Sequence, residues 1–180
     1  MKVSQLTIPG VVYAGPGSVE KINEVLQREK AQSVLLFTDK AVRGAGLTKR
    51  VEEICSAVKL TVIDDLASEP SYQDVERVID EVSVANIDLV IGVGGGSVMD
   101  AAKLASIVIG ADYGVRDLLK DPTIAKKYIK SLMIPTTCGT GSEATCNSIV
   151  AIPEEQSKQG IVNNCMIPDY VILDAEMIRH

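Results

Sequence analysis

Short apolar runs of strand length alternate along the chain with segments whose apolar residues recur at helical spacing. The runs fall at residues 33–38, 60–63 and 87–93. A typical helical segment begins at Ser71 and carries its valines and its isoleucine on one face. Strands that are apolar on both faces, separated by amphipathic helices, are typical of a parallel sheet. The pattern therefore predicts an α/β fold in which helices cover both faces of the sheet.

The N-terminal and C-terminal parts of the chain depart from this rhythm. Residues 3–13 alternate only loosely and contain a proline and a glycine, which predicts an edge strand or a hairpin. Ser18 follows a Gly-Pro-Gly turn and is expected to cap the next helix. Beyond Gly110 a polar segment leads to a strand at 131–134. No internal repeat or low-complexity linker interrupts residues 1–180, so we expect one domain.

The apolar run at 87–93 passes directly into a glycine cluster and then into a helical pattern. The glycines are Gly92, Gly94, Gly95 and Gly96. Ser97 is placed to cap the helix, and Asp100 can answer it three residues later in a capping box. Glycine N–H groups approach a ligand without an intervening Cβ, and a helix start favours an anion, most often a phosphate. The spacing ends on serine where the Rossmann fingerprint has glycine, so a turn that binds nothing is the alternative.

A second loop, rich in small and hydroxyl-bearing residues, follows strand 131–134 and extends to residue 145. Because both loops follow parallel strands, we expect them to open at the same carboxyl edge of the sheet, where ligands of open α/β sheets bind. Their hydroxyl groups belong to Ser97, Thr136, Thr137, Thr140, Ser142 and Thr145. Together with the glycine amides they suit a pyrophosphate and two riboses. For the second loop alone, a turn capped by its own hydroxyls is the alternative.

Two further charged residues are candidates for the same site. Asp39 ends the strand at 33–38, where its carboxylate can accept from both hydroxyls of an adenosine ribose and would repel a 2′-phosphate. The alternative is that Asp39 caps a short helix at 40–43. Lys158 lies in a charged turn, where the alternative is simple solvation. No nucleophile–base pair is evident in the sequence, so a bound cofactor or another segment must supply the chemistry.

Composition narrows the class of protein. The 180 residues carry a net charge of −6, which argues against nucleic acid or an anionic membrane as a partner, because both need a basic surface. No apolar run is long enough to span a bilayer. The 4 cysteines form no CxxC pair, and 1 histidine is too few for a His-rich metal site. We therefore expect a cytoplasmic protein with reduced thiols.

Two long motifs carry a family resemblance. They are Gly94-Gly95-Gly96-Ser97-x-x-Asp100-x-x-Lys103 and Ile134-Pro135-Thr136-Thr137-x-Gly139-Thr140-Gly141-Ser142-Glu143-x-Thr145. In these motifs the chain resembles the iron-dependent (group III) alcohol dehydrogenases, over essentially all of residues 1–180. The resemblance implies a Rossmann-like dinucleotide-binding domain that precedes an all-helical domain holding Fe²⁺ or Zn²⁺. It also implies a homodimer that acts on a small alcohol or aldehyde.

By position, the resemblance implies a role toward NAD for each candidate residue. Asp39 would select NAD over NADP through the adenosine ribose, while Gly96 and Ser97 would cradle the pyrophosphate. The nicotinamide side would be lined by Thr136, Thr137, Thr140 and Thr145, with Lys158 on the nicotinamide ribose. The predicted cofactor-binding set is completed by Gly94, Gly95, Asp100 and Ser142.

The sequence departs from the family pattern at two places. Glu69-Pro70 stands where the family commonly has Asn-Pro. The aspartate and three histidines that bind the family's metal have no counterpart here, and His180 matches no ligand position. We therefore predict the cofactor-binding half of a dehydrogenase, inactive by itself toward alcohols. The alternative is a free-standing nucleotide-binding module without catalysis.

Overall fold

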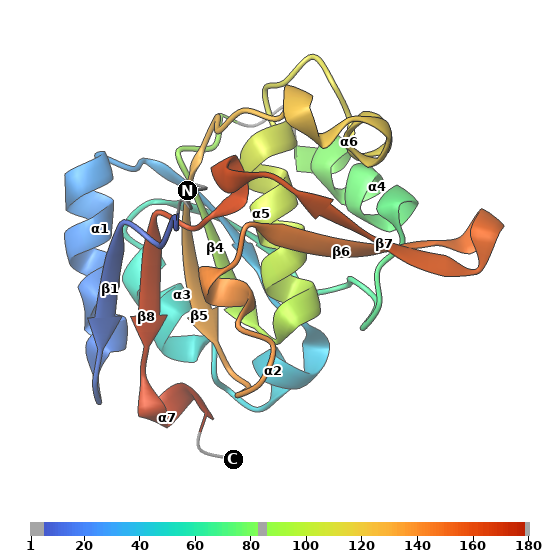
Figure 1. Cartoon of the computed structure of the whole chain (residues 1–180). Helices are drawn as coiled ribbons and strands as arrows, with labels where there is room; N and C mark the ends of the chain where they lie inside the picture. The colour runs from blue at the N-terminus through green and yellow to red at the C-terminus, as the bar shows by residue number, and fades with distance from the viewer. Residues whose placement is uncertain (1–5, 83–85, 179–180) are drawn as a thin grey trace, which may run out of the picture.

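The computed structural model describes residues 6–82 and 86–178, and it contains a twisted six-stranded sheet whose neighbouring strands are all parallel (Figure 1). Its strands are β1 (Val11–Ala14), β2 (Ser33–Phe37), β3 (Lys59–Ile63), β4 (Leu89–Gly94), β5 (Lys130–Pro135) and β8 (Tyr170–Leu173). They lie in the order β1-β8-β5-β4-β2-β3. The central strands β2, β4 and β5 are almost wholly buried, as their uninterrupted apolar runs predict.

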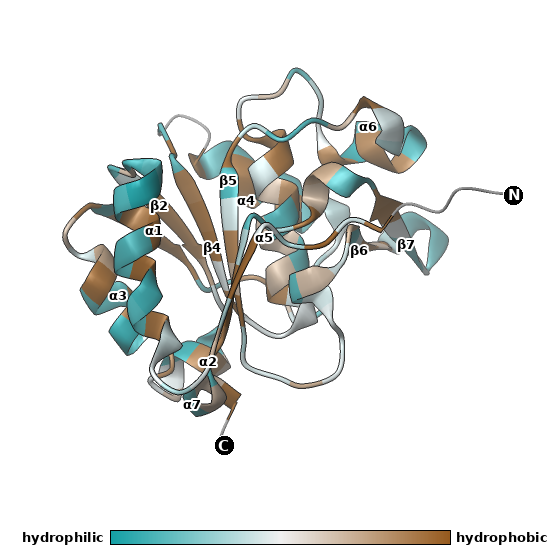
Figure 2. Ribbon diagram, turned by 60° about the vertical axis from the view of Figure 1, so that its left-hand side comes forward, coloured by the Kyte–Doolittle hydropathy of each residue, from teal (hydrophilic) through white to brown (hydrophobic). Residues whose placement is uncertain are grey.

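Helices cover both faces of the sheet, which confirms the α/β, Rossmann-like prediction (Figure 2). One face packs against α1 (Ile22–Glu29), α3 (Lys49–Cys55) and α7 (Ala175–Ile178), and the other against α4 (Tyr72–Val82), α5 (Gly96–Val108) and α6 (Val115–Lys120). The short helix α2 (Lys40–Gly44) follows β2. Side chains of β2 alternate between the two cores: Leu35 and Phe37 join the α4–α5 side, while Val34 and Leu36 join the α1–α3 side.

A two-stranded antiparallel hairpin stands apart from the main sheet. It consists of β6 (Asn147–Ile152) and β7 (Ser157–Val162), and its tip extends away from the body of the protein (Figure 1). Val150, Ile152 and Ile161 anchor its inner side in the core beside α4 and α5. Short 3₁₀ turns occupy Ser18–Lys21, Pro122–Ile124, Ser142–Ala144, Pro153–Glu155 and Asn164–Met166.

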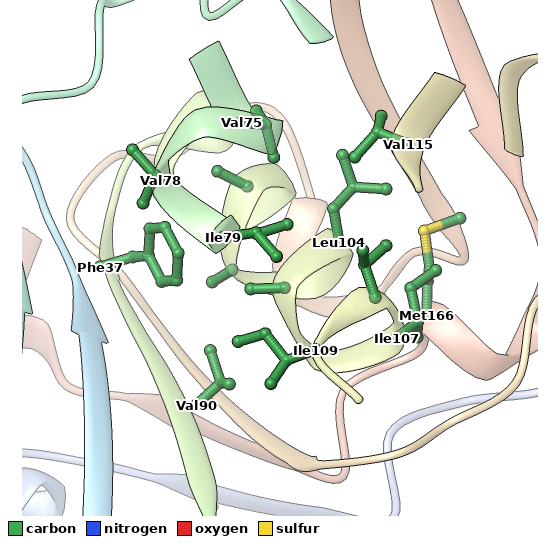
Figure 3. Close-up of a cluster of buried hydrophobic side chains, with 14 of the residues drawn as sticks. Phe37, Val75, Val78, Ile79, Val90, Leu104, Ile107, Ile109, Val115 and Met166 are labelled. Atoms are coloured by element: carbon green, nitrogen blue, oxygen red, sulfur yellow. The ribbon is translucent and has the colours of Figure 1, made fainter. Parts of the chain in front are cut away.

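Helix α5 lies unusually close to the sheet. A Cβ added to Gly92 of β4 would lie 2.8 Å from the Met133 sulfur and 3.0 Å from the Ala102 Cβ, so glycine is what permits this approach. The small alanines of α5 provide the matching thin face, and every residue from Val98 to Val108 is buried. In Figure 3 Leu104 and Ile107 of this helix point into the same core as Phe37 and Val90 of the strands. Close packing here fixes where α5 begins, and its N-terminus lies at the carboxyl edge of the sheet.

The edge strand predicted near the N-terminus is present, but it is shorter than the predicted segment 3–13. The chain begins its sheet contribution with an edge strand, but β1 spans only Val11–Ala14 and pairs in parallel with β8, and no hairpin forms among residues 6–14. The part of the predicted segment before residue 6 lies outside the described residues. Pro9 and Gly10 limit the pairing, because proline has no N–H to give and glycine weakens strand formation.

Two predicted helix caps are wrong. Ser18 does not cap its helix; Gly17 is the N-cap of the 3₁₀ turn, and the Val19 N–H is instead bonded to the Asp174 carboxylate at 3.1 Å. Ser97 does not cap α5, because the helix starts one residue earlier and Gly95 holds the N-cap position without a side-chain bond. In both places a glycine of the turn occupies the cap position, and Gly17 does so in the left-handed conformation that favours glycine.

None of the helices in the described part of the chain is both long and apolar enough to cross a membrane. The four cysteines are free: Cys55 is buried, Cys146 and Cys165 are partly buried, and Cys138 is exposed. Burial raises the pKa of the Cys55 thiol to about 12, so this thiol stays protonated at neutral pH.

Candidate functional site

Two loops meet at the carboxyl edge of the sheet, as predicted. The turn from β4 into α5 lies against the loop that follows β5, because β4 and β5 are neighbours and the Thr136 N–H continues their pairing to the Gly94 carbonyl at 3.0 Å. A Cβ added to Gly96 would lie 2.9 Å from the Thr140 Cγ2, and one added to Gly95 would lie 3.7 Å from the Thr137 Oγ1. Glycine at position 96 therefore allows the second loop to pack on the start of α5.

A cavity of about 280 Å³ opens where these loops meet the β6–β7 hairpin and the loop between β3 and α4. Of the predicted cofactor-binding residues, its walls contain Gly96, Ser97, Asp100, Thr140, Ser142, Thr145 and Lys158. The cavity is also lined by Glu69 and Pro70, which the sequence analysis named only as a departure from the family, and by Asn147, Ile149, Val150 and Ala151, which it did not name. These added residues come from the hairpin and the β3–α4 loop, whose position depends on tertiary packing.

The start of α5 gives the cavity its capacity for an anion. The Met99 N–H closes the first turn onto the Gly95 carbonyl at 3.1 Å, so the N–H groups just before it have no partner within the helix. Gly96 and Ser97 carry two of these N–H groups and line the cavity. The thirteen-residue helix adds the positive end of its dipole at the same point. Such a terminus suits a phosphate or a carboxylate.

Beneath the cavity floor, a buried ion pair joins α5 to both neighbouring segments. Lys103 is fully buried, and its ammonium lies 2.9 Å from the Asp100 carboxylate. It donates to the Ser142 carbonyl at 3.0 Å, to the Thr145 hydroxyl at 3.3 Å and to the Asn147 carbonyl. Three acceptors and a carboxylate thus surround one cation, which meets the requirement that a buried charge be paired and hydrogen-bonded.

Asp100 completes this network and does not form the predicted capping box. Its carboxylate accepts from the Ser142 hydroxyl and from the Ile149 N–H, the latter at 3.0 Å, and its carbonyl accepts from the Ser148 hydroxyl at 3.0 Å. The carboxylate points away from its own helix start because the second loop and β6 offer donors there. The predicted local role of Asp100 is therefore replaced by a long-range one.

The electrostatics of Lys103 reflect two opposed effects. Burial lowers the pKa of its ammonium, and the nearby Asp100 carboxylate works against that change by favouring the charged form. Sequence reasoning placed Lys103 in a motif but gave it no role. The available signal was a lysine inside a helix that is otherwise apolar on every side, since a helix of that kind is buried and a buried lysine needs partners.

Asn147 presents a polar atom that the fold does not use. Its side-chain Oδ1 is buried and has no hydrogen-bond partner among the described residues. Asn147 lines the cavity next to Thr145 and pairs with Val162 across the hairpin. A buried amide oxygen without a partner is costly. A Cβ added to Gly160 would lie 2.7 Å from this oxygen, so glycine is what allows the oxygen to pack against the neighbouring strand.

At the mouth of the cavity Lys158 of β7 faces Glu69 of the β3–α4 loop. The ammonium and the carboxylate lie 2.6 Å apart, and the two side chains are 52% and 66% exposed. The half-exposed Lys158 side chain remains in contact with solvent, as the alternative proposed, and it also forms this ion pair. Lys158 and Glu69 are both part of the cavity lining.

The remaining predicted residues lie near the cavity but not in its walls. Asp39 caps α2, with its Oδ1 accepting from the Val42 N–H at 2.8 Å, as the alternative proposed. Asp39 nevertheless lies at the same sheet edge as Gly94, since each follows by two residues the register pair of Phe37 with Gly92. The bond to the Val42 N–H uses only one of the two carboxylate oxygens of Asp39. Gly94, Gly95, Thr136 and Thr137 form the join between the two loops.

Within residues 6–82 and 86–178, no three of the His, Cys, Asp and Glu side chains come close enough together to hold a metal ion. The carboxylates at the cavity are committed elsewhere: Asp100 to Lys103 and Glu69 to Lys158. The chemistry this site offers is therefore that of an anion-binding helix start with hydroxyls, one cation and a partly apolar wall.

Comparison with known proteins gives this arrangement a context. The sequence model of a family described as iron-containing alcohol dehydrogenase matches residues 9–175. The long-chain-alcohol dehydrogenase 1 of Geobacillus thermodenitrificans is 31% identical over 98% of this chain and 46% of its own length. The sulfoacetaldehyde reductase of Bilophila wadsworthia is 30% identical over 95% of this chain and 44% of its own length.

Solved structures agree with these sequence relatives. An iron-containing alcohol dehydrogenase from Thermotoga maritima superposes with a TM-score of 0.87 at 27% identity, covering 98% of this chain and 49% of that one. The sulfoacetaldehyde reductase of Bifidobacterium kashiwanohense, solved in complex with NAD⁺, has a TM-score of 0.90 at 24% identity and covers 99% and 48%. The chain thus spans about half the length of the relatives it matches.

Proposed function

This chain belongs to the iron-containing alcohol dehydrogenase family, and on that premise we propose that it is the part of such an enzyme that binds NAD. The reaction we propose for the whole enzyme is hydride transfer between the nicotinamide cofactor and a small alcohol or aldehyde. The observation that carries the proposal is the cavity at the carboxyl edge of the sheet, where the start of α5 meets the hydroxyl-rich loop.

The residues of the cavity fit a dinucleotide. Gly96 and Ser97 at the start of α5 line the cavity, and their N–H groups suit the pyrophosphate. The hydroxyls of Thr140 and Thr145 supply polar groups that suit the hydroxyls of a ribose. NAD when bound supplies the hydride acceptor, and these residues bind and orient it.

Asp39 supports a preference for NAD over NADP. Its carboxylate ends β2 on the same edge as the cavity, and only one of its oxygens is used in capping α2. A 2′-phosphate placed beside it would meet like charge, which disfavours NADP by about 1–3 kcal/mol in a partly desolvated cleft. We expect Asp39→Gly to narrow the difference between the two affinities. Equal affinity for both cofactors in the parent protein would rule this role out.

The family's iron is not assigned to these residues. Three imidazoles cannot come from one copy of a 180-residue sequence with 1 histidine, and the described carboxylates do not gather into a ligand set. We therefore propose no step through a metal for this part of the protein. We further propose that residues 1–180 by themselves bind the cofactor without oxidising alcohols, with or without added Fe²⁺ or Zn²⁺.

Calorimetry with NAD⁺ tests the proposed function directly. We expect weak but saturable binding to the 180-residue protein and its loss in Gly96→Val, because the added side chain would displace Thr140 and cover the start of α5. Gly44→Ala is the matched control, since a Cβ there meets no atom within 4 Å. Absence of saturable heat at millimolar cofactor, or equal binding by Gly96→Val, would contradict the proposal.

A turnover assay separates the two candidate classes of function. Ethanol, butanol and 1,2-propanediol are offered with NAD⁺ to residues 1–180 alone and again after mixing with a separately expressed helical domain of the family. Turnover only on mixing would identify the cofactor half of a dehydrogenase. Turnover by residues 1–180 alone would overturn the assignment of inactivity. A free-standing nucleotide-binding module would bind NAD⁺ and remain inactive in both assays.

Two further properties belong to the proposal. We propose a homodimer, because β1 is an edge strand whose outer side is not paired within the sheet and Val12 is exposed along it. We also propose a cytoplasmic location, which the four free thiols favour. Sedimentation at tens of micromolar tests the first, and a clean monomer would count against it. Fractionation of cells that express the protein tests the second.

A further inference from the structure

The pairing of Glu69 with Lys158 is the feature of the cavity that the proposed function does not explain. The two residues come from separate segments, the β3–α4 loop and strand β7, and both line the cavity. Their 2.6 Å contact joins two neighbouring segments of the cavity lining. A ligand that enters the cavity meets this ion pair.

Backbone contacts, not chance, bring the two side chains together. The Pro70 carbonyl accepts from the Ala151 N–H at 3.1 Å, and Ser71 forms an isolated parallel bridge with the same residue. Ala151 is in turn the register partner of Lys158 in the hairpin. Glu69 therefore directly precedes the residue whose carbonyl is bonded to Ala151 of β6, and Lys158 is paired with Ala151 on the adjacent strand.

The charges at the cavity make this contact consequential. Among the described residues that line the cavity, Lys158 carries the one positive charge, while Glu69 and Asp100 are acidic. Asp100 is already neutralised by Lys103 from below. The cation available to an anionic ligand is therefore Lys158, and Glu69 holds it.

We propose that Glu69 lowers the affinity for the dinucleotide by competing with it for Lys158. This inference rests on the proposed function, because it assumes that an anionic dinucleotide occupies the cavity. In the closed pair the Lys158 ammonium is turned toward Glu69. When the pair opens, Lys158 can contact the ligand. The strength of the Glu69–Lys158 pair therefore affects how tightly the ligand is bound.

A double-mutant cycle measured by calorimetry with NAD⁺ tests the competition. Glu69→Gln keeps the shape of the side chain and removes its charge, and we expect tighter binding by about three- to tenfold, the scale of an exposed ion pair and its field. Lys158→Met should weaken binding. In the Lys158→Met background the gain from Glu69→Gln should shrink, because the cation for which Glu69 competes is gone.

The opposite result identifies the simpler explanation. If Glu69 only repels the ligand through space, its charge is less shielded without the lysine, and the gain from Glu69→Gln would persist or grow in the Lys158→Met background. That outcome, or unchanged or weaker binding by Glu69→Gln alone, overturns the competition. Glu155→Gln is the matched control: it removes one negative charge from the hairpin at a side chain that contacts Ser157, and its affinity should equal that of the parent.

A second measurement works without any cofactor. Acetylation of lysines by an amine-directed reagent, followed by mass spectrometry, should modify Lys158 faster in Glu69→Gln than in the parent, with exposed Lys120 as the internal reference. Unchanged labelling would show that the pair does not hold the lysine and would overturn the inference. Failure of NAD⁺ to bind any variant would instead overturn the proposed function, and labelling would still report whether the ion pair forms.

Discussion

On the sheet face covered by α1 and α3, charged side chains pair at the surface, whereas on the face covered by α4 and α5 an ion pair lies inside the protein. Arg50 and Glu20 on the first face are each 50% exposed, and Lys103 on the second is fully buried. Both faces bury a continuous apolar core. The α4–α5 face also has exposed pairs, such as Arg77 with Glu81, so what distinguishes it is the additional buried pair of Lys103 with Asp100.

This difference coincides with the location of the cavity. The exposed pairs on the α1–α3 face connect helices to one another and to the 3₁₀ turn, and solvent can replace either partner. The buried pair connects α5 to the loop after β5 and to β6, which form two walls of the cavity. Polar groups buried in this way must all be satisfied at once, so they hold their surroundings in one arrangement. We therefore expect the protein to be most rigid where the loops of the site are attached to α5.

Removing the buried cation should have the largest effect. Lys103→Met leaves the Asp100 carboxylate without its partner and removes the donor to the Ser142 and Asn147 carbonyls, so we expect a loss of about 3–5 kcal/mol in the free energy of unfolding. Urea unfolding followed by circular dichroism measures it. Lys120→Met is the matched control, because Lys120 is exposed and its contact with Asp117 is 3.7 Å long. Similar stability of the two variants would show that the buried pair is not special.

Overpacking beneath α5 should have the next largest effect. Gly92→Ala would place a Cβ 2.8 Å from the Met133 sulfur and 3.0 Å from the Ala102 Cβ, so the helix must move from the sheet or the methionine must shift. Such overpacking costs about 1–3 kcal/mol. The same unfolding assay measures it, with Gly44→Ala as the unhindered glycine control. If the two glycine variants unfold alike, the close approach of α5 does not depend on this glycine.

These two positions also show what the sequence could predict. The apolar runs and helical spacing predicted the parallel sheet, the helices on both faces and the meeting of the two loops, because burial on a sheet follows periodicity. Asp39 was predicted with both of its possible roles, and the structure confirms the capping role while the cofactor role stays a prediction.

Ser97 fails as a cap because α5 begins one residue earlier than expected. The other failures share one physical cause. Ser18 and Asp100 were expected to cap by their position in the sequence, but a cap forms only where no better partner arrives from elsewhere. Asp174, 155 residues from Val19, takes over the first turn, and Asp100 finds the Ile149 N–H 49 residues away. The hairpin wall of the cavity was missed for the same reason, since its place depends on contacts between distant segments. Local pattern predicts the elements well and their long-range polar partners poorly.

Removing the cap at the start of α4 should lower the free energy of unfolding by an intermediate amount, and the contribution of this cap should depend on pH. The Ser71 hydroxyl accepts from the Asp74 N–H at 3.1 Å, and the Asp74 carboxylate accepts from the Ser71 N–H at 2.9 Å. We expect Ser71→Ala to cost about 1 kcal/mol, as loss of an N-cap typically does. The bonds from Ser71 lower the pKa of Asp74, so its contribution is complete above the ordinary carboxyl pKa and is lost as the pH falls through the lowered one.

Asp74→Asn tests that sign. The variant should be less stable than the parent at pH 7, and the two should converge as the pH is lowered past the carboxyl range. Urea melts at a series of pH values measure the difference. A gap that is independent of pH would mean that the shape of the cap matters and the charge of Asp74 does not.

The smallest effect is expected on the α1–α3 face, where Arg50 lies 2.7 Å from Glu20 through its Nη2 and contacts Glu53 as well. Hydrogen bonds from Arg50 lower the pKa of Glu20, so any stabilisation is present at pH 7 and disappears as the pH falls through the lowered value. Because all three side chains are about half exposed, water and salt compete for the same groups, and holding long side chains in one geometry costs entropy. We therefore expect Arg50→Met to leave the urea midpoint at pH 7 within experimental error of the parent, and Glu20→Gln to do the same. A loss comparable to that of Lys103→Met would show that an exposed ion pair can fix this fold as firmly as a buried one, and the distinction between the two faces would fail.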